Sequence, residues 1–88
     1  MRIVREIPHP ELKITIFHWN NRYLIKLEAD LLEQTYKIQE YDVSSDEEVA
    51  QILDNEFITE VIKIFHNMSK GLNDSVSRLQ DPRNSLAE

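Results

Sequence analysis

The sequence predicts a small α+β domain: a three- to four-stranded antiparallel sheet, a meander around a central hairpin, followed by a short and a long C-terminal helix packed on one face. Two observations support this prediction. Residues 12–29 contain two alternating β-type runs around the pair Asn20-Asn21. From Ser44 onwards, apolar residues recur instead at steps of three and four, which is the period of a helix.

The length of 88 residues predicts one domain, which we expect to span residues 1–80, with a flexible C-terminal tail at 81–88. A chain this short buries only about 60–70% of the surface that it exposes when unfolded. Oligomerisation is a common way for such a small domain to gain stability.

The first strand is predicted over Arg2–Ile7, with Ile3 and Ile7 on one face and Val4 on the other. Two prolines follow at positions 8 and 10. Proline has no backbone N–H and fixes its φ angle, so the chain must turn there.

The central hairpin is predicted with a two-residue turn at Asn20-Asn21, since asparagine tolerates the positive φ angles of a type I′ turn. This register makes one face almost entirely apolar, whereas a slip of one residue would mix apolar and polar positions. The apolar face pairs His18/Tyr23, Ile16/Ile25, Ile14/Leu27 and Leu12/Ala29. The second face pairs Trp19/Arg22, Phe17/Leu24, Thr15/Lys26 and Lys13/Glu28.

A further strand is predicted over Gln34–Gln39, after a loop at Asp30–Glu33. Its register is left open between two alternatives. A four-residue loop would set Lys26 opposite Lys37, and a shift by two residues would set Glu28 opposite Lys37.

Two helices are predicted in the second half. Ser44-Ser45, with a glutamate three residues after each serine, forms a capping box for a short helix that ends near Leu53. Asp54 or Asn55 caps a long helix from Glu56 to about Gln80. Its apolar stripe keeps its phase across Gly71, which favours a continuous helix over one that breaks there and folds back. The stripe contains Ile58, Val61, Phe65, Met68, Leu72, Val76 and Leu79.

The run ITIFHWNNRYLIKLEADLLEQTYKI, with REIP before it and a helical, acidic-starting C-terminal third, resembles a family of short uncharacterised bacterial proteins. This resemblance covers most of the chain. It implies the same architecture and carries no activity, ligand or site residue.

The net charge of −6 comes from one segment, because residues 42–60 contain seven acidic and no basic side chains. Such a segment repels a phosphate backbone, so we expect no nucleic-acid partner. The chain has no cysteine, no signal-peptide core and no apolar run of membrane-spanning length. We therefore expect a cytoplasmic protein with no membrane partner.

No catalytic residue, cofactor-binding residue or metal ligand is predicted. The three histidines (His9, His18 and His66) do not share the spacing of ligands on one helix or strand. The sequence also lacks a Gly-rich phosphate loop, a G-x-S-x-G motif and an H-E-x-x-H motif. The sequence therefore predicts a protein that is not an enzyme.

Apolar residues that the predicted fold leaves uncovered form the candidate interaction surface. Helices on one face of the sheet leave the other face open, and a 25-residue helix extends past strands of at most eight residues. The candidates are Phe17, Trp19, Leu24, Leu72, Val76 and Leu79. We predict a non-catalytic protein–protein interaction or self-association domain, most simply a homodimer, with an unidentified protein partner as a further possibility. The alternatives are a single-stranded nucleic-acid binder that uses the sheet aromatics and, third, a small enzyme or ligand carrier.

Overall fold

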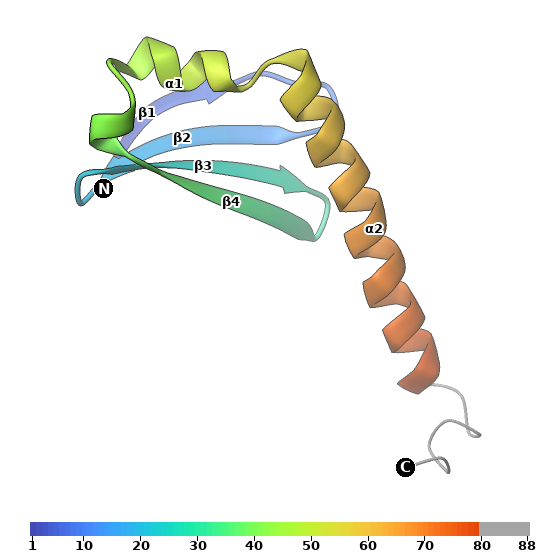
Figure 1. The fold of residues 1–88 in the computed structure, drawn as a ribbon. Coiled ribbons are helices and arrows are strands. Elements are labelled where there is room, and N and C mark those ends of the chain that lie inside the picture. Colours follow the sequence, from blue (N-terminus) through green and yellow to red (C-terminus); the bar gives the residue numbers. More distant parts are fainter. Residues whose placement is uncertain (80–88) are drawn as a thin grey trace.

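The computed structural model describes residues 1–79 and shows an antiparallel four-stranded meander followed by helices, as the sequence predicts (Figure 1). The strands follow one another across the sheet in the order β1-β2-β3-β4. A flexible tail predicted at 81–88 lies outside the described residues. The elements are β1 (Arg2–Ile7), β2 (Lys13–Trp19), β3 (Arg22–Ala29), β4 (Leu32–Gln39), the 3-10 turn η1 (Glu40–Asp42), α1 (Asp46–Ile52) and α2 (Asn55–Leu79).

The hairpin of β2 and β3 has the predicted register at all seven of its pairs, whereas the predicted pair Leu12/Ala29 lies outside the ladder, because β2 begins at Lys13. Trp19 lies opposite Arg22, and the pairing continues to Lys13 opposite Glu28. Asn20 and Asn21 have φ angles of 53° and 61°, which confirms the two-residue turn with both central residues in the left-handed region.

The faces predicted for β1 are wrong, because a β-bulge interrupts the strand at Val4. Ile3 lies opposite Phe17, and the next paired residue, Arg5, lies opposite Ile16. The extra residue reverses the alternation, so Ile7 and Val4 pack against the core whereas Ile3 lies on the other face and is 58% exposed.

Both registers left open for β4 are also wrong. The turn has two residues, Asp30 and Leu31, and places Ala29 opposite Leu32 and Lys26 opposite Thr35. Asp30 adopts a φ of 57°, which aspartate tolerates better than most residues. The shorter turn brings Leu32 into the strand, where its side chain packs against the core.

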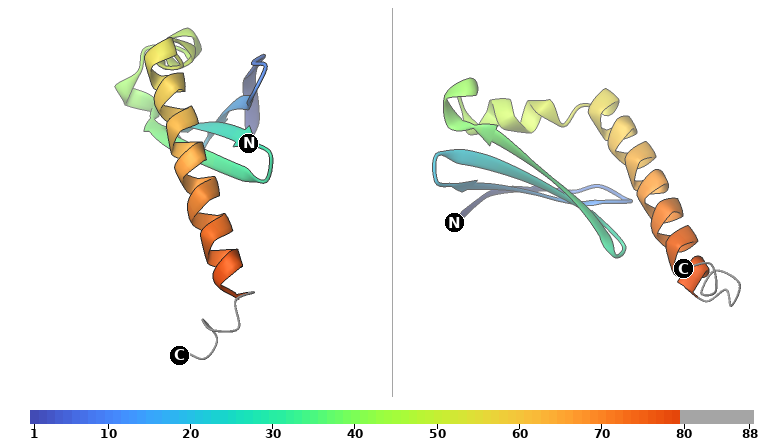
Figure 2. Two further views of the ribbon diagram at one scale, coloured as in Figure 1. Left: turned by 90° about the vertical axis from the view of Figure 1, so that its right-hand side faces the viewer. Right: turned by 60° about the horizontal axis from the view of Figure 1, so that its bottom comes forward.

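The core lies between the sheet and the helices, which cover one face (Figures 1 and 2). Ser45 caps α1 by accepting a hydrogen bond from the Glu48 amide at 3.2 Å, and Asp54 caps α2 by accepting one from the Phe57 amide at 2.8 Å. The buried apolar residues are Leu12, Ile14, Ile16, Tyr23, Ile25, Leu27, Val49, Val61 and Phe65.

Helix α2 is continuous through Gly71, as predicted. It crosses the end of the sheet near the β3–β4 turn, and its C-terminal half extends beyond the sheet (Figures 1 and 2). The molecule is therefore elongated, with extents of 55 × 27 × 18 Å. Its radius of gyration is 17.1 Å, whereas a compact domain of this length would have about 12 Å.

Candidate functional site

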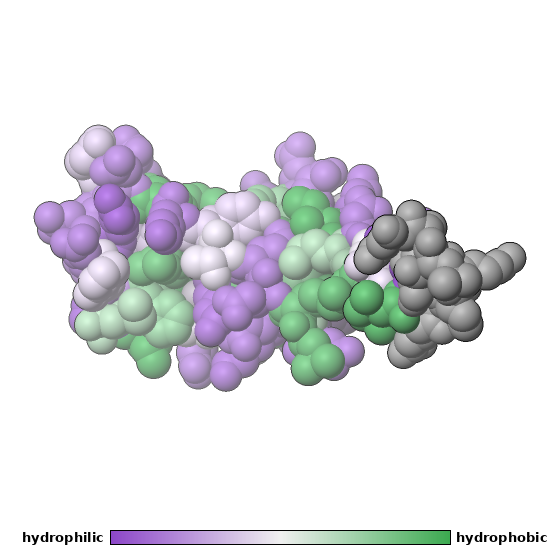
Figure 3. Space-filling view, turned by 90° about the horizontal axis from the view of Figure 1, so that it is seen from below, coloured by the Kyte–Doolittle hydropathy of each residue, from purple (hydrophilic) through white to green (hydrophobic). Residues whose placement is uncertain are grey.

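The six predicted interaction residues lie on two separate surfaces. We call Leu72, Val76 and Leu79 the α2 stripe, and the side of the sheet away from the helices, with Phe17, Trp19 and Leu24, the open sheet face. Trp19 adjoins the β2–β3 turn, whereas the α2 stripe lies near the β3–β4 turn, at the other end of the eight-residue strand β3. That strand length corresponds to about 26 Å. Figure 3, viewed from below, likewise shows hydrophobic side chains towards both ends of the molecule with hydrophilic ones between them.

The α2 stripe continues the buried face of the helix beyond the sheet. Phe65 is 5% exposed, whereas Leu72, Val76 and Leu79 are 53%, 43% and 78% exposed. Among residues 1–79, these three side chains belong neither to the hydrophobic core nor to the residues packed against it. The helix thus keeps its apolar face over the last two turns after its intramolecular partner has ended.

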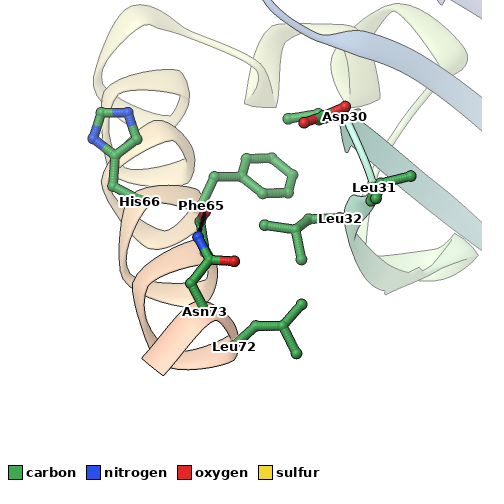
Figure 4. Close-up of a pocket in the computed structure, with 9 residues that line it drawn as sticks. Asp30, Leu31, Leu32, Phe65, His66, Leu72 and Asn73 are labelled. Carbon is green, nitrogen blue, oxygen red and sulfur yellow. Dashed lines mark hydrogen bonds between the residues drawn. The ribbon is translucent and has the colours of Figure 1, made fainter. Parts of the chain in front are cut away.

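A groove of about 300 Å³ separates the β3–β4 turn from α2. Phe65 and Leu72 point from α2 towards Leu32, while the His66 ring points away from them (Figure 4). The base of the groove is apolar and its rim is polar. The lining residues are Ala29, Asp30, Leu31, Leu32, Phe65, His66, Ser69, Leu72 and Asn73.

Leu31 also lines this groove, although it is not among the six predicted interaction residues. Its side chain is 94% exposed at the tip of the turn, beside the groove. The sequence offered one indication of this surface: Leu31 and Leu32 are adjacent leucines inside the predicted loop at Asp30–Glu33. An exposed apolar side chain is informative when it adjoins other exposed apolar residues, as Leu31 adjoins Leu72 at this groove.

The open sheet face carries apolar side chains in a row across three strands. Ile3 on β1 lies opposite Phe17 on β2, and Phe17 lies opposite Leu24 on β3. Phe17 and Leu24 are partly buried by their neighbours, whereas Trp19 is 50% exposed. The described chain therefore covers only half of the single tryptophan.

The two sides of the sheet differ in charge. On the helical side, Arg5 bonds Glu47 at 2.9 Å and Arg2 lies 3.8 Å from Asp46, so these cations offset part of the acidic segment. On the open face, Lys26 lies 3.8 Å from Glu28. Three other cations on that face have no acidic partner within 4 Å among residues 1–79: Lys13, Arg22 and Lys37.

A polar cluster joins the hairpin to η1 and α1. The Tyr23 hydroxyl donates to Asp46 Oδ1 at 2.6 Å, and His18 Nε2 lies 3.1 Å from Glu40 Oε1. The rings of His18 and Tyr23 meet edge to face, with centroids 4.9 Å apart, as expected for cross-strand partners. The hydrogen bond to Asp46 raises the pKa of Tyr23, with burial and the negative charges of Asp46 and Glu40 adding to it. The phenol stays protonated at neutral pH, and the cluster serves to hold the layers together.

The three histidine side chains do not lie together at one site. His18 contacts Glu40, and the ring of His9 accepts a hydrogen bond from the Glu11 amide at 3.1 Å. His66 lies at the rim of the groove. Within residues 1–79, no group of three histidine, aspartate or glutamate side chains is placed to hold a metal ion.

In the described part of the chain, neither helix combines the length and the apolar character needed to cross a membrane.

Comparison with family models, with curated proteins and with solved structures finds no match to this chain. The resemblance to short bacterial proteins therefore stays a prediction, and the site must be interpreted from its own geometry.

Proposed function

We propose that this protein is a non-catalytic domain that acts through protein–protein contact and forms a homodimer through the α2 stripe and the adjoining groove. A single observation carries the proposal. The last two turns of α2 leave Leu72, Val76 and Leu79 between 43% and 78% exposed among residues 1–79, directly beside an apolar groove. A bacterial origin and a cytoplasmic location belong to the same proposal and rest on the sequence alone.

The free energies of burial and association favour an interface that covers Leu31 together with the whole α2 stripe. Full burial of one aliphatic side chain contributes about 1.5–3 kcal/mol, whereas association costs about 4–15 kcal/mol. One exposed leucine is therefore too little. Leu31 and the three residues of the α2 stripe offer four partly or fully exposed side chains in each copy, which is enough for a dimer when all are covered.

Concentration-dependent unfolding tests this proposal. The midpoint of thermal unfolding of a dimer rises with protein concentration, because association stabilises only the folded state. We expect this rise in the parent protein. Leu72→Asp should abolish it, since two desolvated carboxylates replace two leucines and weaken association by more than about a hundredfold.

Asn67→Asp is the matched control, because it adds the same charge at an exposed α2 position that does not line the groove. This variant should keep the concentration dependence of the parent. A parent protein whose midpoint is independent of concentration would rule out the homodimer.

Single-stranded nucleic acid is the second candidate partner, and one observation favours it despite the net charge. Arg22 and Lys37, both unpaired among residues 1–79, lie on the open sheet face next to Trp19 and Leu24. Exposed aromatic rings beside cations can stack on bases and contact phosphates. The seven acids of residues 42–60 follow β4, in the part of the chain that forms the helical layer.

Titration of a labelled single-stranded oligonucleotide at about 0.1 M salt tests the second candidate. Self-association as the main role predicts weak binding or none. A sub-micromolar affinity that falls with salt, and that is lost in Trp19→Ala but kept in Tyr41→Ala, would replace our first proposal. Tyr41 is the suitable control because it is an exposed aromatic residue on η1, outside the sheet.

A further inference from the structure

We infer that the groove between the β3–β4 turn and α2 is occupied by the end of α2 from a second copy, with the two helices antiparallel and a two-fold axis beside Leu72. This inference rests on the proposed self-association and adds its geometry: which segment enters which groove.

The inserting segment is the end of the α2 stripe. Val76 and Leu79 follow Leu72 by four and seven residues, so they lie on the same face, one and two turns further along the helix. They are 43% and 78% exposed. The segment therefore presents two aliphatic side chains in a row, beyond the end of its own sheet.

The receiving site is complementary in shape and polarity. Its volume of about 300 Å³ equals about ten water molecules, which is room for two aliphatic side chains. The less exposed residues Ala29, Leu32 and Phe65 supply an apolar base, while the exposed residues Asp30 and Asn73 stand at a polar rim. This arrangement of an apolar centre and a polar rim is typical of protein interfaces.

A second helix can approach α2 closely around Leu72. The positions around Leu72 on the helix surface, three and four residues away, are Met68, Ser69, Ser75 and Val76, and none is charged. The neighbouring charges, Lys70 and Asp74, bond each other at 3.4 Å. A Cβ atom built on Gly71 would meet no atom within 4 Å, so the helix is uncrowded on that side as well.

Two-fold symmetry explains why the occupant is a second copy. When Leu72 faces Leu72 across an antiparallel pair, Val76 comes opposite Met68 and Leu79 comes opposite Phe65. Each helix end then enters the partner's groove, so the α2 stripe and the groove of both copies are covered at once. A parallel pair would place Leu79 against Leu79 and leave both grooves empty.

Disulfide crosslinking tests this geometry cleanly, because the natural chain contains no cysteine. The tested positions Leu31, Leu72 and Leu79 are all more than half exposed, so cysteine there leaves the core intact. Leu72→Cys, next to the axis, should form a covalent dimer with itself. A mixture of Leu31→Cys and Leu79→Cys should form a mixed dimer, whereas Leu79→Cys alone should not.

Tyr41→Cys is the control, because Tyr41 is 79% exposed on η1, an element that contributes nothing to the groove. Proximity in the dimer should make crosslinking of Leu72→Cys roughly a hundredfold faster than that of Tyr41→Cys.

The mass of the uncrosslinked parent distinguishes a failure of the homodimer from a failure of its antiparallel geometry. A monomeric parent contradicts the proposed function. A dimeric parent in which Leu79→Cys links to itself, or Leu72→Cys links no faster than Tyr41→Cys, overturns the antiparallel arrangement alone.

Discussion

Tyr23 shows at the scale of one residue how the two layers are joined. Its ring belongs to the buried face of the hairpin, while its hydroxyl reaches Asp46 at the start of α1. The sequence predicts the position of the ring, since alternation places it on the apolar face. The bond to Asp46 was not predictable, because it depends on where α1 returns across the sheet.

Tyr23→Phe should lower the free energy of unfolding by about 1 kcal/mol at pH 7, because it removes one hydrogen bond to a partly exposed carboxylate. Urea unfolding measures this change. Tyr41→Phe, which removes a phenol from an exposed position, should leave the free energy unchanged. Equal effects of the two substitutions would contradict the role assigned to the bond.

The same bond predicts a pH dependence. The folded state raises the pKa of Tyr23 above its unfolded value of about 10, chiefly through the hydrogen bond to Asp46. The folded state therefore holds the proton more tightly, and its contribution to stability is complete below about pH 10 and declines as pH rises through the folded pKa. The parent should lose more stability than Tyr23→Phe between pH 9 and about pH 11, as measured by urea unfolding. Parallel curves would argue against this linkage.

Gly71→Ala should stabilise the protein by about 1 kcal/mol, because alanine favours the helix and its Cβ meets no neighbouring atom. Thermal unfolding at fixed concentration measures the gain. A loss of stability would mean that another chain approaches Gly71 more closely than the proposed interface requires.

At the scale of the elements, the sequence predicts best where two independent signals coincide. The β2–β3 hairpin combines turn residues with strict alternation, and its register is confirmed from Trp19/Arg22 to Lys13/Glu28. The β3–β4 turn offers only Asp30 as a turn residue beside an apolar Leu31, so its length could not be inferred. The bulge at Val4 has no local signature, because it exists only in relation to β2.

The α2 stripe of the candidate site was predictable from periodicity, whereas the groove beside it was not. Periodicity identifies which face of α2 is apolar and how far it continues. The groove requires Leu31 and Leu32 to lie beside Phe65 and Leu72. That placement depends on tertiary packing between a turn and a helix more than 30 residues apart in the sequence.

The N-cap residue of α2, Asp54, is predicted to contribute to the stability of the fold. Asp54→Ala should cost about 1 kcal/mol, since it leaves the Phe57 amide without its side-chain acceptor. Asp42→Ala removes the same charge at an exposed position in η1 and should have little effect. Urea unfolding of both variants checks the difference, and a similar loss in both would point to overall charge instead of capping.

At the scale of the whole molecule, the elongated shape is the feature that most needs an explanation. A four-stranded sheet with α1 and the first half of α2 forms a closed core, and the rest of α2 extends away from it (Figure 1). Extending the apolar face of an amphipathic helix into water gives no stability by itself. The proposed dimer, in which a second copy covers the α2 stripe, would account for both the length of the helix and the groove at its side.

Sedimentation equilibrium of the parent protein, from low to high micromolar concentration, tests the self-association most directly. The expected result is a mass that rises from that of the 10.4 kDa monomer to twice that value, and that stays at the monomer value in Leu72→Asp. A parent that remains at 10.4 kDa at the highest concentration would contradict the homodimer.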